Sequence, residues 1–183
     1  MAENLRVSKF RNGVEIMNIS DAEEWSIIGN DVLSSPAPAW CYNNNDPSNN
    51  IPFGKLYNWY AVSDTNKICP SGWHIPTNSD WNILIKHVDV FADTTISDGA
   101  QSQIGGGHLK SIGNKLWIRP NIGATNSSGF SAVGGGFRAS SGVYSPPGIY
   151  SYWWSTDVDM YDSEKALSRN LEFISGVISY FPM

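Results

Sequence analysis

Acidic side chains gather between positions 157 and 164, where they could hold a metal ion. Ca²⁺ binds about six to eight oxygen ligands, and Asp157, Asp159, Asp162 and Glu164 are close enough in sequence to offer several. The spacing does not match an EF-hand loop, and a short acidic run is also typical of a solvated surface loop. We favour the loop and keep Ca²⁺ as the alternative, with Asp157, Asp159 and Asp162 as candidate ligands. No other cofactor is expected.

Aromatic side chains form a second cluster in positions 149–156, a stretch that predicts a buried strand. Their rings could stack on sugars or on the side chains of a protein ligand. Because adjacent strand residues point to opposite faces, at least one of Trp153 and Trp154 is expected in the core. The candidate ligand-binding residues are Tyr144, Tyr150, Tyr161 and Trp153.

The two cysteines, Cys41 and Cys69, fit either one disulfide in an exported protein or two buried thiols in a cytoplasmic one. We expect the disulfide, because both residues flank loop-rich segments that a covalent link would stabilise. The three histidines lack metal-ligand spacing, and neither a Cys-His pair nor a Ser-His-Asp triad follows from residue order. The sequence therefore predicts no catalytic residues and a protein that is not an enzyme.

Composition restricts the classes of partner. The 183 residues fit one domain, and 41% hydrophobic residues suffice for a core. Only 16% of residues are charged and the net charge is −5, so a nucleic-acid partner is not expected. No apolar run reaches the roughly 20 residues of a transmembrane helix, and residues 1–4 do not resemble a signal peptide. Abundant aromatic, Gly, Asn and Ser residues favour short strands and long hydrogen-bonded loops.

The first third of the chain predicts a hairpin, a helix and a long loop. Residues 4–17 indicate a hairpin, because Asn12-Gly13 is a strong two-residue turn signal. Residues 20–29 indicate a helix, with Ser20 and Glu23 as a capping box and Gly29 at the end. Residues 30–52 favour a loop, and the aromatic stretch 53–62 does not distinguish helix from strand.

The clearest element is a helix from Asn78 to about Phe91, because Thr77 and Asp80 can form a capping box at its start. Its apolar face would consist of Trp81, Leu84, Ile85, Val88 and Phe91. The composition of residues 93–108 favours a mobile loop. That of residues 109–148 favours short strands among packed loops. Strands are expected over 149–156, over 165–173 with alternating apolar and polar faces, and over 177–181.

Several segments resemble the Fibrobacter succinogenes major paralogous domain, a family of bacterial surface and secreted modules, and they occur in the same order along the chain. The matching segments are residues 1–5 (MAENL), 39–44 (AWCYNN), 53–62 (FGKLYNWYAV), 69–81 (CPSGWHIPTNSDW), 123–130 (GATNSSGF), 135–138 (GGFR) and 152–156 (YWWST).

The resemblance implies a C-type-lectin-like α+β fold, with twisted antiparallel sheets, two helices and long Gly/Asn/Ser-rich loops. This fold is similar to that of the formylglycine-generating enzymes. Members of the family usually begin one strand before Met1 and end one strand after Met183. The chain is therefore expected to be a single domain, residues 1–183, that lacks its first and last strands.

The leading functional hypothesis is a non-catalytic binding module that recognises a glycan or a protein ligand outside the cell or at its surface. An export signal would then lie outside this sequence. A second hypothesis is a structural subunit of a surface filament or complex, either a homo-oligomer or a subunit completed by a neighbour's strand. A third is an oxidase-like enzyme of the formylglycine-generating type. Those enzymes act through cysteines in the substrate groove, whereas Cys41 and Cys69 both lie in the first half of the chain.

Overall fold

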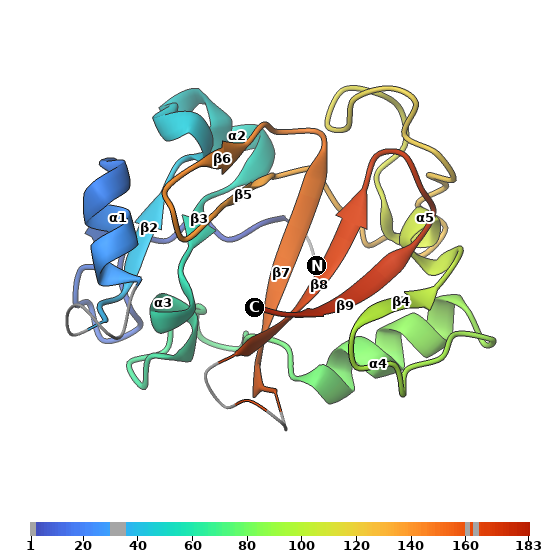
Figure 1. Cartoon of the computed structure of the whole chain (residues 1–183), viewed down its shortest axis with the longest axis horizontal. Helices are drawn as coiled ribbons and strands as arrows, with labels where there is room; N and C mark the ends of the chain where they lie inside the picture. Colours follow the sequence, from blue (N-terminus) through green and yellow to red (C-terminus); the bar gives the residue numbers. More distant parts are fainter. Residues whose placement is uncertain (1–2, 30–35, 160–161, 163–164) are drawn as a thin grey trace.

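A four-stranded antiparallel sheet forms the centre of the computed structural model, which describes residues 3–29, 36–159, 162 and 165–183. The strands are β4 (Gly99–Ser102), β7 (Tyr150–Val158), β8 (Ala166–Glu172) and β9 (Ile178–Pro182), in the order β4-β9-β8-β7. Figure 1 shows β7 in the middle of the molecule, with β3 and α3 on one side and α4 on the other. The mixture of helices and antiparallel sheets confirms the predicted α+β class.

The strand β8 is buried on both faces, which the alternating sequence did not predict. Leu167 and Leu171 face the core as expected, but Ser168 and Asn170 on the opposite face are also buried. Aromatic side chains of β7 lie beside these residues on the second face, because Tyr152 pairs with Asn170 and Trp154 with Ser168 across the sheet. The strand therefore needs a hydrogen-bonding network on its polar face, and Ser168 Oγ donates to the Phe181 carbonyl at 3.0 Å.

The helix α4 (Asn78–Val88) starts as predicted. Thr77 Oγ1 accepts a hydrogen bond from the Asp80 N–H at 3.0 Å, and Asp80 Oδ2 accepts one from the Thr77 N–H at 2.8 Å. The helix ends at Val88, with Asp89 as its C-cap, so Phe91 does not extend its apolar face. The Phe91 side chain is instead 92% exposed.

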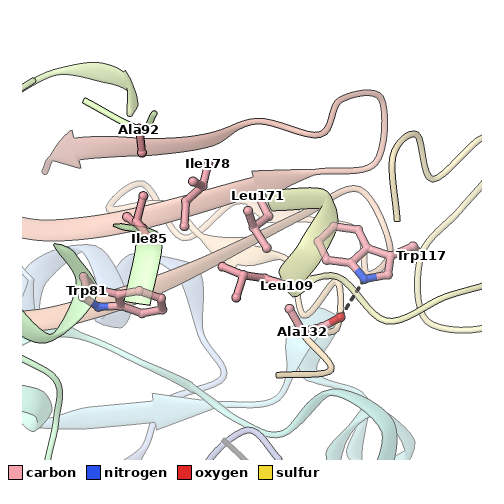
Figure 2. Packing of buried hydrophobic residues seen from close by; sticks show 8 residues of the cluster. All are labelled: Trp81, Ile85, Ala92, Leu109, Trp117, Ala132, Leu171 and Ile178. Atoms are coloured by element: carbon pink, nitrogen blue, oxygen red, sulfur yellow. Dashed lines mark hydrogen bonds between the residues drawn. The ribbon is translucent and has the colours of Figure 1, made fainter. Parts of the chain in front are cut away.

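The main core lies between α4 and the sheet. Figure 2 shows Ile85 of α4 and Leu109 of α5 (Gly105–Leu109) beside Leu171 and Ile178 of the sheet. Trp117 enters from a loop, and its indole N–H donates to the Ala132 carbonyl at 2.8 Å. The core thus joins a helix, the sheet and the long loop region into one packed unit.

The prediction of a mobile loop over 93–108 was wrong, because the structure forms β4 and α5 there. The glycine run 105–107 is buried and allows close backbone packing. A Cβ on Gly106 would lie 2.2 Å from the Val177 carbonyl oxygen, and one on Gly107 would lie 2.2 Å from the Gly123 carbonyl oxygen. The local sequence pattern does not predict such contacts between distant segments.

The first third of the chain forms a hairpin and a smaller sheet. The predicted hairpin is present, since Phe10 N–H donates to the Val14 carbonyl at 2.8 Å around Asn12-Gly13. The small sheet consists of β1 (Met17–Asn18), β2 (Ala39–Cys41) and β3 (Leu56–Tyr57). The helix α1 (Ala22–Ile28) begins one residue later than predicted, because Asp21 caps it instead of Ser20.

Short elements occupy most of the described part of the loop predicted over 30–52. Besides β2 they are η1 (Asn43–Asn45), η2 (Pro47–Asn49) and α2 (Asn50–Phe53), and α3 (Trp59–Ser63) follows. Two further strands, β5 (Phe137–Arg138) and β6 (Tyr144–Ser145), form a hairpin in the loop region. In the described part of the chain, no helix has the length and apolar character needed to cross a membrane.

Two cationic side chains are completely buried, which is unusual for Lys and Arg. The Lys110 ammonium donates to three main-chain carbonyls. Arg169 donates to the side-chain oxygens of Asn78 and Asn82 on α4, and its guanidinium lies 4.4 Å from the centre of the Tyr180 ring. Both cations hold distant segments together.

Candidate functional site

A cleft of about 1400 Å³ separates the first half of the chain from β7. Its walls come from residues 3–7, 53–62 and 68–76, from the centre of β7 and from the segment 135–140. Many of the lining side chains are aromatic. They include Trp59, Tyr60, Trp73, Tyr152, Trp153 and Trp154.

The segment around Asn4 connects the two walls. The Asn4 side chain donates to the Phe53 carbonyl at 2.8 Å and accepts a hydrogen bond from the Trp153 indole N–H at 3.3 Å. The Trp154 indole N–H donates to the Tyr57 carbonyl at 3.0 Å. Because both indole N–H groups have partners within the protein, these tryptophans offer mainly their apolar ring faces to the cleft.

Trp153 and Trp154 point to opposite faces of β7, as expected for adjacent strand residues. Trp153 packs against Trp81 and Phe130, with ring centres 6.1 Å and 6.2 Å apart. Trp154 packs against Trp59 at 5.8 Å. Both are half-buried and both line the cleft, so the core and the site share these rings.

The turn 70–73 places one tryptophan at the rim of the cleft. The Arg11 guanidinium donates to the carbonyls of Cys69 at 2.9 Å, Pro70 at 3.1 Å and Trp73 at 3.1 Å, which fixes the turn. The Trp73 side chain remains 59% exposed. An exposed tryptophan in an ordered turn is a good candidate for ligand contact. Trp73 is not among the residues predicted from the sequence, although a tryptophan in a polar turn is a signal that can indicate ligand contact.

The tyrosines predicted as ligand-binding residues lie elsewhere. Tyr144 is half-buried, and its hydroxyl donates to Asn45 Oδ1 at 2.7 Å. The Tyr150 ring packs 6.0 Å from that of Phe137. Neither is among the described residues that line the cleft, and Tyr161 lies outside the described residues. Of the predicted set, the structure places Trp153 in the cleft.

The acidic residues predicted as Ca²⁺ ligands take part in local structure. Asp157 Oδ2 accepts a hydrogen bond from the Asn78 N–H at the start of α4. Asp159 Oδ1 accepts one from the Asp162 N–H at 3.1 Å, and the Asp162 carboxylate lies 3.4 Å from Lys165 Nζ. Over the described residues, which do not include Glu164, no three His, Cys, Asp or Glu side chains gather as a metal site would require. Ca²⁺ binding stays a prediction.

Asp157 and Asp159 also line a smaller pocket of about 420 Å³, beside Tyr180 and the start of α4. Among the described residues, none lines both this pocket and the aromatic cleft. Its polar groups already bond to the helix and to the loop. We therefore assign the candidate ligand site to the larger cleft.

Cys41 and Cys69 are free, buried thiols, so the predicted disulfide is not formed in this structure. They belong to different hydrophobic clusters, Cys41 beside Trp25 and Cys69 beside Phe10 and Trp40. Burial raises the pKa of both thiols, which keeps them protonated and weakly nucleophilic.

A family described as the Fibrobacter succinogenes major domain matches residues 1–177 of the chain. The match spans every lining segment of the cleft that precedes residue 178. Comparison with curated proteins and with solved structures finds no match.

Proposed function

The chain belongs to the Fibrobacter succinogenes major domain family, and we propose that it is a non-catalytic module that binds a glycan in its aromatic cleft. The observation that carries this proposal is the lining of the cleft by tryptophan and tyrosine rings, of which Trp153 and Trp154 bond their indole N–H groups within the protein. The proposed place of action is outside the cell or at its surface.

Ring faces of this kind suit sugars. The C–H faces of a pyranose ring are apolar enough to pack on an aromatic ring, while its hydroxyl groups need polar partners at the edges. Trp59, Tyr152 and Trp154 supply rings on one face of β7, and the exposed His74 side chain supplies a polar group in the same lining. Rigid rings give contact area at a small cost in conformational entropy.

The shape of the site favours a glycan over a folded protein. Pockets for small ligands commonly measure about 300–1,000 Å³, so 1400 Å³ has room for several sugar units. A protein partner usually needs about 800 Å² of open surface on each side. A concave, ring-lined cleft meets the first requirement better than the second.

The proposed finer fold is C-type-lectin-like. The central antiparallel sheet, the two longer helices α1 and α4, and the extended loops between residues 110 and 149 support this proposal. In such an arrangement the loops and one face of the sheet are free to form a ligand site.

Two exposed aromatic residues make a matched test. Trp73→Ala removes a ring from the rim of the cleft, whereas Phe91→Ala removes a ring that is 92% exposed outside the described lining. We expect Trp73→Ala to weaken binding to the best ligand on a glycan array by about tenfold, or about 1.4 kcal/mol. Phe91→Ala is expected to leave the affinity unchanged.

Both variants are expected to fold normally, because substitutions at exposed sites usually change stability by less than about 0.5 kcal/mol. Isothermal titration calorimetry gives the affinities, and thermal unfolding checks the folds. Equal affinities of the two variants, or an array on which the wild-type protein binds no glycan, would contradict the proposed function.

A further inference from the structure

The cleft differs in charge from the rest of the chain. Its described lining includes three cationic side chains, Arg6, Lys55 and Arg138, and two carboxylates, Glu3 and Asp80, leaving a net charge of +1 with His74 neutral. The whole chain carries −5. The positive charge of the cleft is therefore local, and it bears on which ligands the cleft can take.

Most of these charges already have partners within the protein. Arg6 forms an ion pair of 2.6 Å with Glu3. Arg138 donates to the carbonyls of residues 19, 20, 21 and 142 at 2.6–3.1 Å. Asp80 accepts from the Thr77 N–H and hydroxyl and lies 3.4 Å from His74. These four groups have little capacity left for a charged ligand.

Lys55 is different. Arg138 also lies against rings, 4.5 Å from that of Trp25 and 4.8 Å from that of Tyr144, but it donates to carbonyls as well. The contacts of the Lys55 ammonium with the described residues are ring faces. Its Nζ lies 3.5 Å from the centre of the Trp40 ring and 5.8 Å from that of Tyr42. No carboxylate among the described residues lies within ion-pair distance of it. Glu15, whose charge acts on Lys55 from farther away, is itself paired with Lys9 at 2.7 Å.

The ammonium is also held in place. The Lys55 backbone N–H donates to the Leu5 carbonyl at 3.0 Å. This bond fixes the base of the Lys55 side chain beside the segment around Asn4, which connects the two walls of the cleft. Trp40 is 7% exposed, and its indole N–H donates to the Ile16 carbonyl at 3.0 Å, so the ring is a rigid support. Partial burial removes water from the ammonium and lowers the pKa of Lys55.

We infer that the glycan is acidic, and that Lys55 binds the carboxylate or sulfate group of one of its sugar units. The inference rests on the proposed function and names the ligand class of the same cleft. A cation on a ring face keeps its N–H groups available, and a charge-assisted hydrogen bond to an anion is about twice as strong as a neutral one. The neighbouring rings of the cleft then stack on the same sugar or on the next one.

A purely structural role is the competing explanation. The aliphatic part of Lys55 also covers Trp40, as long cationic side chains often cover apolar surface. Lys55→Met keeps that cover and removes the charge, whereas Lys55→Arg keeps the charge. Lys86→Met, on the exposed face of α4 and outside the described lining, is the matched control for the loss of one positive charge.

The test uses an array of sugars printed in pairs. Each uronic-acid oligosaccharide stands beside its methyl ester, and each sulfated oligosaccharide beside its desulfated form. The wild-type protein is expected to bind at least one acidic member about fivefold or more tightly than its neutral partner at low salt, and to lose this preference at about 0.5 M salt. A preference for the uronic acid over its methyl ester identifies the bound anion as a carboxylate, and a preference for the sulfated sugar over its desulfated form identifies it as a sulfate.

The variants then locate the effect. Lys55→Met is expected to bind both members of the pair equally, while Lys55→Arg and Lys86→Met keep the preference. The inference would be overturned if the wild type bound neutral sugars as tightly as acidic ones, or if Lys55→Met kept the preference for acidic sugars. Either result would leave the proposed glycan-binding function unaffected. No binding to any sugar would overturn both. The wild-type comparison of paired sugars decides whether the glycan is acidic even if Lys55→Met fails to fold.

Discussion

Replacing the buried Lys110 with Met is expected to destabilise the protein strongly. Lys110 is 0% exposed, and its Nζ donates to the carbonyls of Ile122 at 2.8 Å, Glu172 at 2.9 Å and Ser175 at 2.7 Å. These bonds tie the loop after α5 to the turn between β8 and β9. Methionine has a similar length but donates no hydrogen bond, so the three carbonyls lose this donor.

The size of the effect follows from the three acceptors. Leaving a buried acceptor without a donor costs about 1 kcal/mol or more, so the total loss is about 3 kcal/mol. Natural domains have about 5–15 kcal/mol of stability. For a chain of this length, each kcal/mol lowers the melting temperature by about 2–4 °C. The expected decrease for Lys110→Met is therefore about 6–12 °C.

The pH dependence gives an independent check. Burial lowers the pKa of Lys110 to about 8, below the value of about 10.4 in an unfolded chain. Between these values the unfolded state binds more protons than the folded state, so Lys110 makes the free energy of unfolding rise with pH. Lys110→Met lacks this contribution. The stability difference between wild type and variant should therefore widen from about pH 8 to about pH 10.

Thermal and urea unfolding, followed by circular dichroism, measure both effects. Lys115→Met is the matched control, because Lys115 is exposed and its loss should change stability by less than about 0.5 kcal/mol. A Lys110→Met protein as stable as Lys115→Met would refute the reasoning. A stability difference that shrinks above pH 8 would refute the assigned direction of the pKa shift.

Three further substitutions test local features of the fold by the same unfolding measurements. Thr77→Ala removes the capping box of α4 and should cost about 1 kcal/mol; an unchanged midpoint would contradict the role of the cap. Gly106→Ala should cost more than about 2 kcal/mol, since its Cβ would lie 2.2 Å from the Val177 carbonyl oxygen and the gain in helix propensity is below about 1 kcal/mol; a stabilised variant would show that the close approach is absent. Burial raises the pKa of Tyr57, so above about pH 10 the folded state holds a proton that the unfolded state releases, and the free energy of unfolding should fall as the pH rises. Tyr57→Phe should lose less stability over this pH range than the wild type. An equal loss in both proteins would reject this assignment.

The sequence predicted those elements that depend on neighbouring residues. The capping box of Thr77 and Asp80, the turn at Asn12-Gly13 and the last hairpin all appear where they were expected. Each follows from hydrogen bonds or periodicity within a few residues. The errors occurred mainly where distant segments decide the structure, as at the glycine run 105–107, which packs closely against Val177 and Gly123 instead of forming a mobile loop.

The site was harder to predict than the fold. The sequence predicts Tyr144 and Tyr150 as ligand-binding residues, but in the structure Tyr144 bonds to Asn45 and Tyr150 packs against Phe137. The sequence gives the type of a side chain and not the segment that covers it. Trp153 lines the cleft, and its indole N–H bonds to Asn4, which lies 149 positions away in the chain.

By itself, the sequence determined the α+β class, the family and a chain rich in aromatic rings, because composition, motifs and short-range patterns carry this information. Tertiary structure alone decided which rings face the cleft, which thiols stay free and which cations are buried. Those outcomes depend on contacts between segments far apart in the chain, such as Lys110 with the Ser175 carbonyl. No local pattern encodes such contacts, since each forms only when the whole chain packs.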